Sequence, residues 1–239
     1  MLVVRPKLQN VWGLAYTKHC FHSLLVTYIF ANVFGNMLLS IVVDSSLKDC
    51  REYKGRGRYC DTCKQNQPED SWHCATCNAC ILQRDHHCFF LSQCIGRYNL
   101  RYFVCFLAHA VMSFVLSIYY NYSAMEHLDI TGFMDITFIV VQFFKPGNIS
   151  IPPFDVKKYL YELFLYLNVI AFILCGSLLW LHLGNALRGM TSYERKIGKF
   201  PAKTDLRRNM ERAFGTRWYL AILWPLVDSP LVDKRSKIV

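Results

Sequence analysis

Residues 60–103 read CDTCKQNQPEDSWHCATCNACILQRDHHCFFLSQCIGRYNLRYF, and this stretch decides the fold. It contains seven of the chain's eleven cysteines, together with His73, His86 and His87. Pairs of cysteines separated by two residues recur in it. This spacing is typical of structural zinc sites, because two thiolates on a tight turn reach one tetrahedral ion. The stretch therefore predicts a zinc-binding domain.

The candidate ligands in this stretch outnumber the positions that two zinc ions offer. Seven cysteines and three histidines make ten ligands, whereas two four-coordinate ions take about eight. One thiol and one imidazole are left over, and His86 and Cys88 lie two residues apart beside Asp85. A cysteine next to a histidine and an acid has the features of an activated nucleophile. The alternative is that all ten groups are scaffold.

The composition of the whole chain indicates a membrane protein. Of its 239 residues, 53% are hydrophobic and 15% aromatic, and the formal net charge is +10. The apolar residues occur in runs, as in transmembrane helices. In a membrane protein, excess Lys and Arg mark the cytoplasmic faces, so we expect no nucleic-acid partner. Cysteines at metal-binding spacing also fit the reducing cytosol better than a secreted disulfide framework.

Three segments are long and apolar enough to cross the hydrocarbon core of a bilayer, which takes a helix of about 20 residues. They organise the chain in the following order: a lead-in (1–21), a first span (22–43), a zinc domain (44–101), a second span (102–122), a loop with a possible re-entrant segment at 133–144 (123–158), a third span (159–184) and a basic tail (185–239). The sequence thus predicts an all-α polytopic membrane protein of about three to four spans, with a small double-zinc domain.

Polar residues inside the spans predict which helix faces lie within the bundle. Asn32 and Asn36 lie one helical turn apart in the first span and need partners in lipid. His109 in the second span is either a functional residue or a hydrogen-bonded bundle residue. The third span carries Glu162 near its entry and His182 near its exit.

The distribution of basic residues predicts the orientation in the membrane. The zinc domain holds nine Lys and Arg and the tail twelve, whereas the lead-in and the 123–158 loop hold three each. The positive-inside rule therefore places the zinc domain and the tail in the cytosol. In the tail, Leu206, Met210, Ala213 and Phe214 are spaced for one face of a helix, and residues 218–226 are predicted to lie at the membrane interface.

The tetrapeptide Asp85-His86-His87-Cys88, with the cysteine spacing around it, resembles the zinc-finger DHHC protein S-acyltransferases, or palmitoyltransferases. The family pattern continues as Cys-x4-Asn-x3-Phe, and this chain supplies Cys94, Asn99 and Phe103. The resemblance implies that fatty acyl-CoA is a co-substrate. The fatty acyl chain, expected to be palmitoyl, would be transferred to membrane-proximal cysteines of cytosolic or membrane proteins. A multi-pass protein of an endomembrane, such as the Golgi or endoplasmic reticulum, is the expected location.

The resemblance also implies roles for individual residues. Cys88 is the expected nucleophile, His86 its base and Asp85 the residue that orients the base. Two structural zinc ions would be held by interleaved ligands, although spacing alone allows other partitions. The two implied sets are Cys60, Cys63, His73 and Cys80, and Cys74, Cys77, His87 and Cys94. Three basic residues are candidates for contact with the CoA phosphates or are ordinary positive-inside charges: Arg84, Arg97 and Arg101.

Two further motifs extend the resemblance over roughly residues 22–228. Thr191-Ser192-Tyr193-Glu194 is similar to the family's Thr-Thr-x-Glu, and Asn209 with Phe214-Gly215 is similar to its C-terminal motif. Departures from the family pattern are Phe89-Phe90 in place of Pro-Trp and Asp44-Ser45-Ser46 in place of Asp-Pro-Gly. A divergent vertebrate branch of the family, numbered twenty-four, shares such departures. Family members usually have two spans before the zinc domain, so the resemblance suggests that one is absent here.

Two other functions are compatible with the pattern. A catalytically weak scaffold would use the zinc domain to bind partners. A RING-like ubiquitin ligase would also use interleaved Cys/His pairs. Replacement of Cys88 distinguishes these alternatives from an acyltransferase, because only an acyltransferase needs the Cys88 thiol.

Overall fold

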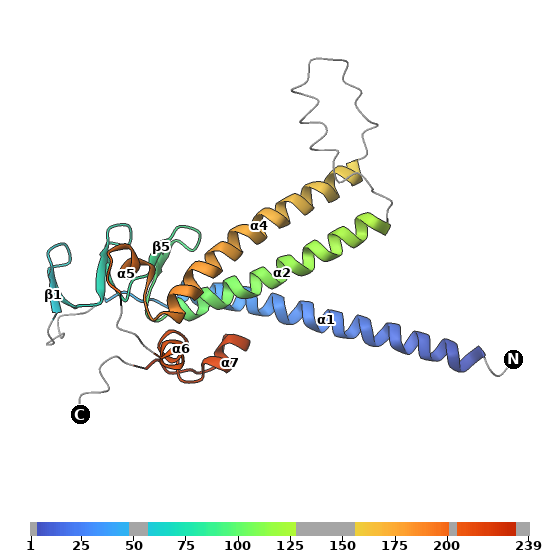
Figure 1. Ribbon diagram of the computed structural model, residues 1–239, viewed down its shortest axis with the longest axis horizontal. Coiled ribbons are helices and arrows are strands. Elements are labelled where there is room, and N and C mark those ends of the chain that lie inside the picture. Colours follow the sequence, from blue (N-terminus) through green and yellow to red (C-terminus); the bar gives the residue numbers. More distant parts are fainter. Residues whose placement is uncertain (1–3, 48–56, 128–155, 201–204, 233–239) are drawn as a thin grey trace, which may run out of the picture. The chain divides into compact units, whose positions relative to one another are not determined.

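The computed structural model describes the backbone of residues 4–47, 57–127, 156–200 and 205–232 (Figure 1). The chain divides into two compact units, one formed by residues 1–109 with 178–239 and the other by residues 110–177. The zinc domain and every residue predicted for the site belong to the first unit. The predicted re-entrant segment at 133–144 lies outside the described residues.

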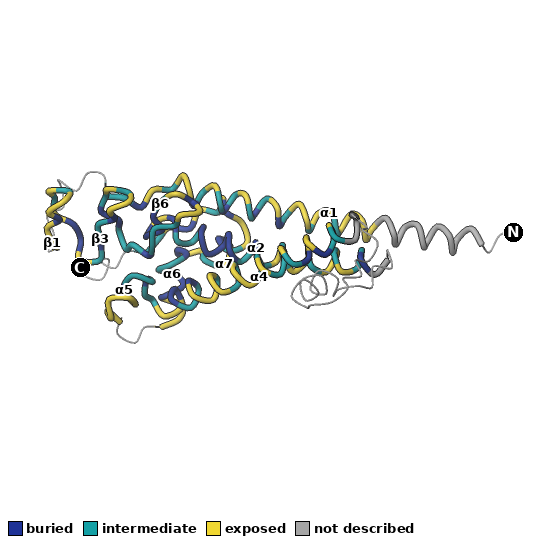
Figure 2. The backbone as a smooth tube through the Cα atoms, turned by 90° about the horizontal axis from the view of Figure 1, so that it is seen from above, coloured by how far each residue is buried: buried dark blue, intermediate teal, exposed yellow. Residues whose placement is uncertain are grey.

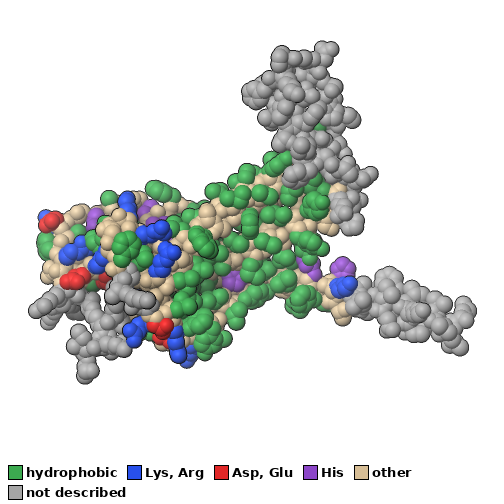
Figure 3. Space-filling view, in the orientation of Figure 1, with side chains coloured by type: hydrophobic (Ala, Val, Ile, Leu, Met, Phe, Trp, Pro, Cys, Tyr) green, Lys and Arg blue, Asp and Glu red, His purple; other side chains and the backbone are tan. Residues whose placement is uncertain are grey.

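Three helices in the described part of the chain are long and apolar enough to cross a membrane: α1 (Val4–Val42), α2 (Leu100–His127) and α4 (Val156–Leu187). Their candidate spans are Thr17–Val42, Leu100–Met125 and Tyr159–Leu187. Figure 3 shows many hydrophobic side chains on the visible face of the described parts of these helices. The three predicted spans are confirmed as helices, and helix α1 begins at Val4, inside the predicted lead-in. The protein is therefore a polytopic, mostly helical membrane protein.

A polar stripe runs along α1. The amide of Asn32 donates to the carbonyl of Tyr28, Asn36 donates to the carbonyl of Asn32, and the hydroxyl of Ser40 donates to the carbonyl of Asn36. All three polar side chains are fully buried, while the opposite face exposes residues such as Phe30. The prediction that Asn32 and Asn36 face the interior is confirmed. This distribution is expected in lipid, where polar groups need partners within the protein.

His109 of α2 packs against the same part of α1. Its ring is buried and stands edge-on to Tyr28, with centroids 6.0 Å apart. Its Nδ1 lies 2.8 Å from the carbonyl oxygen of Cys105, one turn earlier in the helix. Of the two readings of this residue, the structure supports the hydrogen-bonded bundle residue.

The described residues of the zinc domain form three two-stranded antiparallel hairpins (Figure 1). Their strands are β1 (Gly57–Cys60) with β2 (Gln65–Pro68), β3 (Ser71–Cys74) with β4 (Ala79–Leu82), and β5 (His86–Cys88) with β6 (Gln93–Ile95). Lys64 and Asn78 follow the second cysteine of a Cys-x2-Cys pair and have left-handed backbone angles, with φ of 53° and 48°. This conformation is unusual outside glycine and closes each turn tightly, as a metal knuckle requires.

The amide of Asn99 joins the end of α1 to the zinc domain and the start of α2. It is fully buried, and its Nδ2 donates to the carbonyls of Ser40 and Cys94 at 3.1 and 3.0 Å. Its Oδ1 accepts from Gly96 N and Ser45 Oγ at 2.8 and 3.0 Å. All hydrogen-bonding positions of one side chain are thus used to hold three segments together.

The described part of the tail folds back onto α2 and α4 and contains three short helices: α5 (Ser192–Lys196), α6 (Leu206–Phe214) and α7 (Trp218–Leu223). Met210 and Phe214 of α6 enter a buried cluster with Val104, Cys105 and Ala186. Figure 2 shows buried backbone in dark blue near the labels of α6 and α7. The predicted helix is therefore present. Its register differs slightly from the prediction, because Leu206 is exposed and Asn209 is buried in its place.

Candidate functional site

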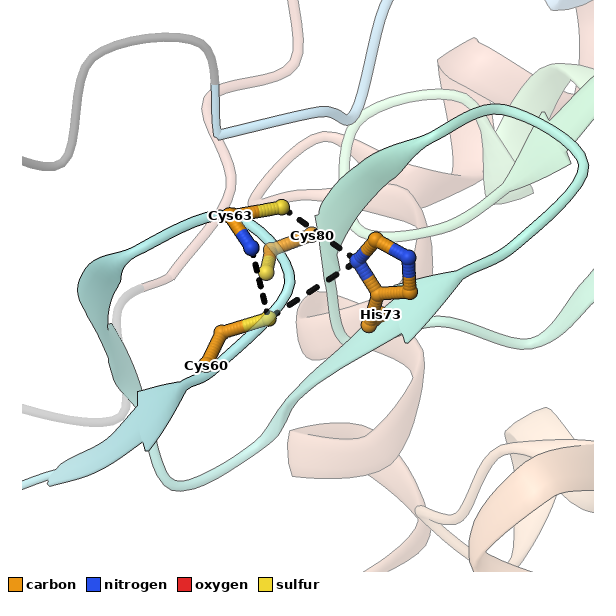
Figure 4. A group of neighbouring side chains, drawn as sticks. All are labelled: Cys60, Cys63, His73 and Cys80. Atoms are coloured by element: carbon orange, nitrogen blue, oxygen red, sulfur yellow. Dashed lines mark hydrogen bonds between the residues drawn. The ribbon is translucent and has the colours of Figure 1, made fainter.

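The first Cys/His cluster joins hairpin β1–β2 to hairpin β3–β4. Cys60 and Cys63 lie on the knuckle of the first hairpin, and His73 and Cys80 are directly opposed in the second. His73 Nδ1 lies 3.7 Å from the sulfur of Cys60 and 3.3 Å from that of Cys63. Figure 4 shows these side chains converging on one point.

The second cluster joins hairpin β3–β4 to hairpin β5–β6 in the same way. His87 Nδ1 lies 3.8, 3.2 and 3.7 Å from the sulfurs of Cys74, Cys77 and Cys94, and His87 and Cys94 are directly opposed in their hairpin. The structure thus gathers each of the two implied ligand sets into one group whose ligand atoms lie within 4.8 Å of one another.

Strand alternation explains why the two ligand sets are interleaved in the sequence. Successive side chains in a strand point to opposite faces. His73 and Cys74 are neighbours in β3, so one reaches the first cluster and the other the second. The same alternation in β5 directs His87 to the second cluster and leaves His86 and Cys88 together on the other face.

Both clusters fit a tetrahedral metal ion. Bond lengths of about 2.3 Å to sulfur and about 2.0 Å to nitrogen place tetrahedral ligands roughly 3.5–3.8 Å apart, close to the distances observed here. Burial raises the pKa of Cys80 far above its usual range, and the thiols of Cys60 and Cys63 raise it further. Burial and the neighbouring thiols of Cys74 and Cys77 likewise raise the pKa of Cys94 far above its usual range. A cation between these sulfurs would reverse both shifts, since it favours the thiolate.

Asp85, His86 and Cys88 form a second kind of group beside the ligands. Oδ2 of Asp85 lies 2.8 Å from Nδ1 of His86, and the carboxylate is almost fully buried. The thiol of Cys88 is partly exposed and, after Asp85, is the neighbour that raises the pKa of the imidazole. Acid, imidazole and thiol therefore occur in the order that an activated nucleophile requires.

The electrostatics of this group favour a reactive thiolate. Burial opposes charge on Cys88, but hydrogen bonding to His86 outweighs it and lowers the pKa of the thiol. Burial would lower the pKa of His86, whereas its hydrogen bonds to Asp85 and Cys88 raise it to about 9. The pKa of the Asp85 carboxyl is lowered, because hydrogen bonds from His182 and then His86 outweigh its burial. Each neighbour thus stabilises the charge on the next.

Two residues of this site were not assigned to it from the sequence. Nδ1 of His182, from the end of α4, lies 2.9 Å from Oδ2 of Asp85. The backbone N–H of Ser192 donates to the other carboxylate oxygen, Oδ1, at 2.7 Å. The available signal was that His182 is an ionisable residue inside a span and that Ser192 belongs to a motif directly after it.

Helix α5 presents the Ser192 N–H because it begins with a capping box. Thr191 Oγ1 accepts from the backbone N–H of Glu194 at 3.1 Å, and Glu194 Oε2 accepts from the backbone N–H of Thr191 at 2.9 Å. The paired contacts satisfy two backbone donors of a helix only five residues long. The Thr191–Glu194 motif therefore sets the direction of the N–H that reaches Asp85.

The three arginines predicted for CoA contact make interactions within the protein. Arg97 is buried and donates to the backbone carbonyls of Arg212 and Val232. Arg101 donates to the carbonyl of Ser229 and stacks on Tyr102, and Arg84 lies over the ring of Tyr193. Arg97 and Arg101 thus hold the tail against α2, and their contact with CoA stays a prediction.

Comparison with known proteins agrees with these motifs. The sequence profile of the family described as DHHC palmitoyltransferase matches residues 53–199. The chain belongs to the DHHC palmitoyltransferase family. It is 31% identical over 220 residues to the Rattus norvegicus protein named Probable palmitoyltransferase ZDHHC24, covering 87% of this chain and 74% of the relative. It is 27% identical over 214 residues to Palmitoyltransferase ZDHHC22 of Mus musculus, covering 87% and 77%. A shorter match, 50% identical over 58 residues, relates it to Palmitoyltransferase ERF2 of Eremothecium gossypii and covers 24% of this chain and 16% of that protein.

The family match confirms the resemblance predicted from the tetrapeptide and favours an acyltransferase over the scaffold and RING-like alternatives. As a DHHC palmitoyltransferase, the chain has an unusual aromatic pair after Cys88. Phe89 and Phe90 are 83% and 75% exposed, and the Phe90 ring stacks on Phe106 of α2 at 6.3 Å. These rings are exposed directly beside Cys88, at the start of a span.

Proposed function

We propose that this protein is a protein S-palmitoyltransferase that works through an acyl-Cys88 intermediate. The observation that carries the assignment is the Asp85–His86 hydrogen bond of 2.8 Å beside a thiol that belongs to neither Cys/His cluster. Eight ligands are gathered into two groups, and the Cys88 sulfur belongs to neither of them and lies beside His86 in β5. This arrangement is what nucleophilic acyl transfer needs.

In the first half-reaction the Cys88 thiolate attacks the thioester carbonyl of palmitoyl-CoA. A new bond forms between the Cys88 sulfur and the carbonyl carbon, and the bond from that carbon to the CoA sulfur breaks. The proton that left Cys88 resides on His86 and passes to the CoA thiolate as it departs. Asp85 keeps the His86 ring in the orientation that both proton transfers require.

In the second half-reaction the thiol of a substrate protein takes the place of CoA. His86 accepts the proton of the substrate cysteine, whose sulfur attacks the acyl-Cys88 carbonyl. The acyl chain moves to the substrate, and Cys88 leaves as a thiolate stabilised by the protonated His86. One thioester replaces another in each step, so positioning matters more than driving force.

The two Cys/His clusters are proposed to hold structural zinc. Three thiolates and one imidazole are a ligand set that zinc prefers, and four protein ligands leave no position for a catalytic water. The ions would fix the hairpins so that β5 presents His86 and Cys88 on one face. Arg84, Arg97 and Arg101 remain the candidates for the CoA phosphates; Arg84 and Arg101 each donate to one protein carbonyl and Arg97 donates to two.

Membrane location supports the same assignment. Cys88 precedes α2, whose candidate span begins at Leu100, so the nucleophile lies near one end of a membrane helix. We propose that this end faces the cytosol of an endomembrane, because most Lys and Arg lie in the zinc domain and tail. Substrates would then be proteins with cysteines close to the membrane surface.

The assignment is tested by incubating the purified protein with labelled palmitoyl-CoA. Wild-type protein should take up a label that hydroxylamine releases, as a thioester does. Cys88→Ser should take up no hydroxylamine-sensitive label while it keeps its metal content. Cys20→Ser is the matched control, because Cys20 is an exposed thiol on α1 outside the zinc domain, and it should label normally. A wild-type protein with intact metal content and no label would overturn the proposal.

A further inference from the structure

His182 shares one carboxylate oxygen with the proposed base. Its Nδ1 lies 2.9 Å from Oδ2 of Asp85, and Nδ1 of His86 lies 2.8 Å from the same atom. The two imidazole rings are 4.7 Å apart and inclined by 34°. His182 and Asp85 are 4% and 3% exposed, so solvent does not replace either contact easily.

The Asp85 carboxylate is held by hydrogen bonds from three different segments. Oδ2 contacts the Nδ1 atoms of His86 in β5 and His182 in α4. Oδ1 accepts a hydrogen bond from the backbone N–H of Ser192 in α5. Two of these contacts come from outside the tetrapeptide. A carboxylate bound only to His86 could turn about its side-chain bonds, and the His86 ring would turn with it. The contacts from α4 and α5 remove that freedom.

His182 is itself held in a fixed orientation. Its ring stands edge-on to Phe103, with centroids 5.1 Å apart. Ser192 Oγ lies 3.4 Å from its Nδ1 and accepts a hydrogen bond from the Asn185 amide at 3.0 Å. The hydrogen bond of the imidazole is therefore directed at Asp85, and its ring also lies against that of His86.

We infer that His182 is a positioning residue for acyl transfer: it donates its Nδ1 proton to Asp85 and thereby holds the carboxylate in the orientation that aims His86 at Cys88. The inference rests on the proposed acyl-Cys88 function and adds to it a residue from the third membrane helix. Outer hydrogen-bond partners of this kind typically change activity by about 10- to 100-fold when they are removed.

Two substitutions of opposite character separate the hydrogen bond from simple packing. His182→Phe keeps an aromatic ring against Phe103 but has no donor. His182→Asn loses ring volume but places an amide N–H near the position of Nδ1. We expect His182→Phe to slow acyl-enzyme formation at saturating palmitoyl-CoA by about 10- to 100-fold, and His182→Asn to stay within a few-fold of wild type. The palmitoyl-CoA concentration for half-maximal rate should change little in either variant.

A packing role predicts the reverse order, with His182→Phe active and His182→Asn impaired, and this result would overturn the inference. Metal content and thermal unfolding are measured on each variant. If His182→Phe does not fold, the pair His182→Asn and His182→Gln decides, because the Gln amide reaches the position of Nε2 instead of Nδ1. Equal activity of these two amides would then refute the Nδ1 hydrogen bond.

Metal analysis of the wild-type protein tests a competing role for the same residues. Asp85, His86 and His182 also present three potential ligand atoms within 4.8 Å of one another. Positioning predicts two bound metal ions for each chain and no loss of metal in His182→Asn. Three ions, falling to two on substitution, would overturn the positioning role. Trp180→Phe is the control on the same helix, because Trp180 is 85% exposed, and it should leave the rate unchanged.

The outcomes for this inference and for the proposed function are distinguishable. Wild-type protein that takes up no label refutes the function and the inference with it. Wild-type protein that labels normally, together with His182→Phe that labels at the same rate, refutes only the role of His182.

Discussion

The backbone N–H of Ser192 donates a hydrogen bond of 2.7 Å to Oδ1 of Asp85, although 107 residues separate them in the sequence. The bond connects the short helix after the third span to the acid beside the proposed base. A backbone donor cannot be removed by substitution of its own side chain, so its position depends on what holds helix α5. The capping box formed by Thr191 and Glu194 is that support.

Removal of the capping box should therefore reduce both stability and activity. Glu194→Ala frees the N–H of Thr191 and should cost about 1 kcal/mol of folding free energy, as lost helix caps usually do. Acyl-enzyme formation should slow, because Ser192 no longer holds Asp85 firmly. Thermal unfolding and single-turnover labelling measure the two effects. Glu194→Gln retains an acceptor oxygen and should retain most of the stability and most of the activity. A Glu194→Gln variant that is fully stable but inactive would contradict this explanation.

Metal removal should unfold the zinc domain and abolish labelling. The hairpins are two strands each, and hairpins of this size are marginal without further support. A strong zinc chelator should release two ions for each chain, expose the ligand cysteines to alkylation and stop label uptake.

Substitution of a ligand cysteine and substitution of Cys88 should have different effects on the metal content of the protein. Cys80→Ala removes a buried member of the first cluster and should lower the metal content, whereas Cys88→Ser should leave it at two ions. Metal lost from Cys88→Ser with its fold intact would show that Cys88 is a ligand.

The reactivity of Cys88 should extend to lower pH than that of an ordinary thiol. Burial alone would raise the pKa of Cys88, but hydrogen bonding to His86 lowers it. The pKa of His86 is raised to about 9, so at neutral pH a protonated imidazole faces the thiolate. Alkylation by iodoacetamide should therefore keep its rate as the pH falls below about 8.5, the usual thiol pKa. His86→Ala should move the midpoint upward, and an unchanged midpoint would contradict the pairing.

Gly96 lies so close to neighbouring atoms that a methyl group at this position should not fit. A Cβ there would lie 2.7 Å from the carbonyl oxygen of Leu82 and 2.8 Å from Ile81 Cγ2. Gly96→Ala should cost about 1–3 kcal/mol by overpacking and loosen the junction held by Asn99. Thermal unfolding provides the measurement. Gly176→Ala is the matched control, since nothing lies within 4 Å of its added Cβ, and it should not lower stability.

Local spacing predicted the features that depend on short segments. Cys-x2-Cys pairs predicted metal clusters because two thiolates on one turn always lie close together, and the apolar runs predicted three membrane helices because their length matches a bilayer. The division of ligands between the clusters needed the family resemblance. Its physical basis is the alternation of His73 and Cys74 in β3, and the sequence alone did not identify β3 as a strand.

Features that depend on distant segments were beyond this reasoning. His182 was recognised only as a polar residue near the end of a span, because no local pattern relates it to Asp85. Arg97 and Arg101 were predicted to meet CoA phosphates from their charge alone. Their guanidinium groups contact carbonyls of the tail, more than 110 residues away, which only the folded chain brings near, and their contact with CoA stays a prediction.

Successive side chains of β5 point to opposite faces, so even-numbered and odd-numbered positions separate the proposed nucleophile from the proposed metal ligand. His86 and Cys88 are even-numbered neighbours on one face, and His87 between them belongs to the other. Deleting His87 would move Cys88 to the ligand face of the strand and turn its sulfur toward the second Cys/His cluster. Exchange of Cys88 with His87 would preserve composition, charge and every atom type in the tetrapeptide, yet it would convert a transferase into a metal-saturated, chemically inert fold.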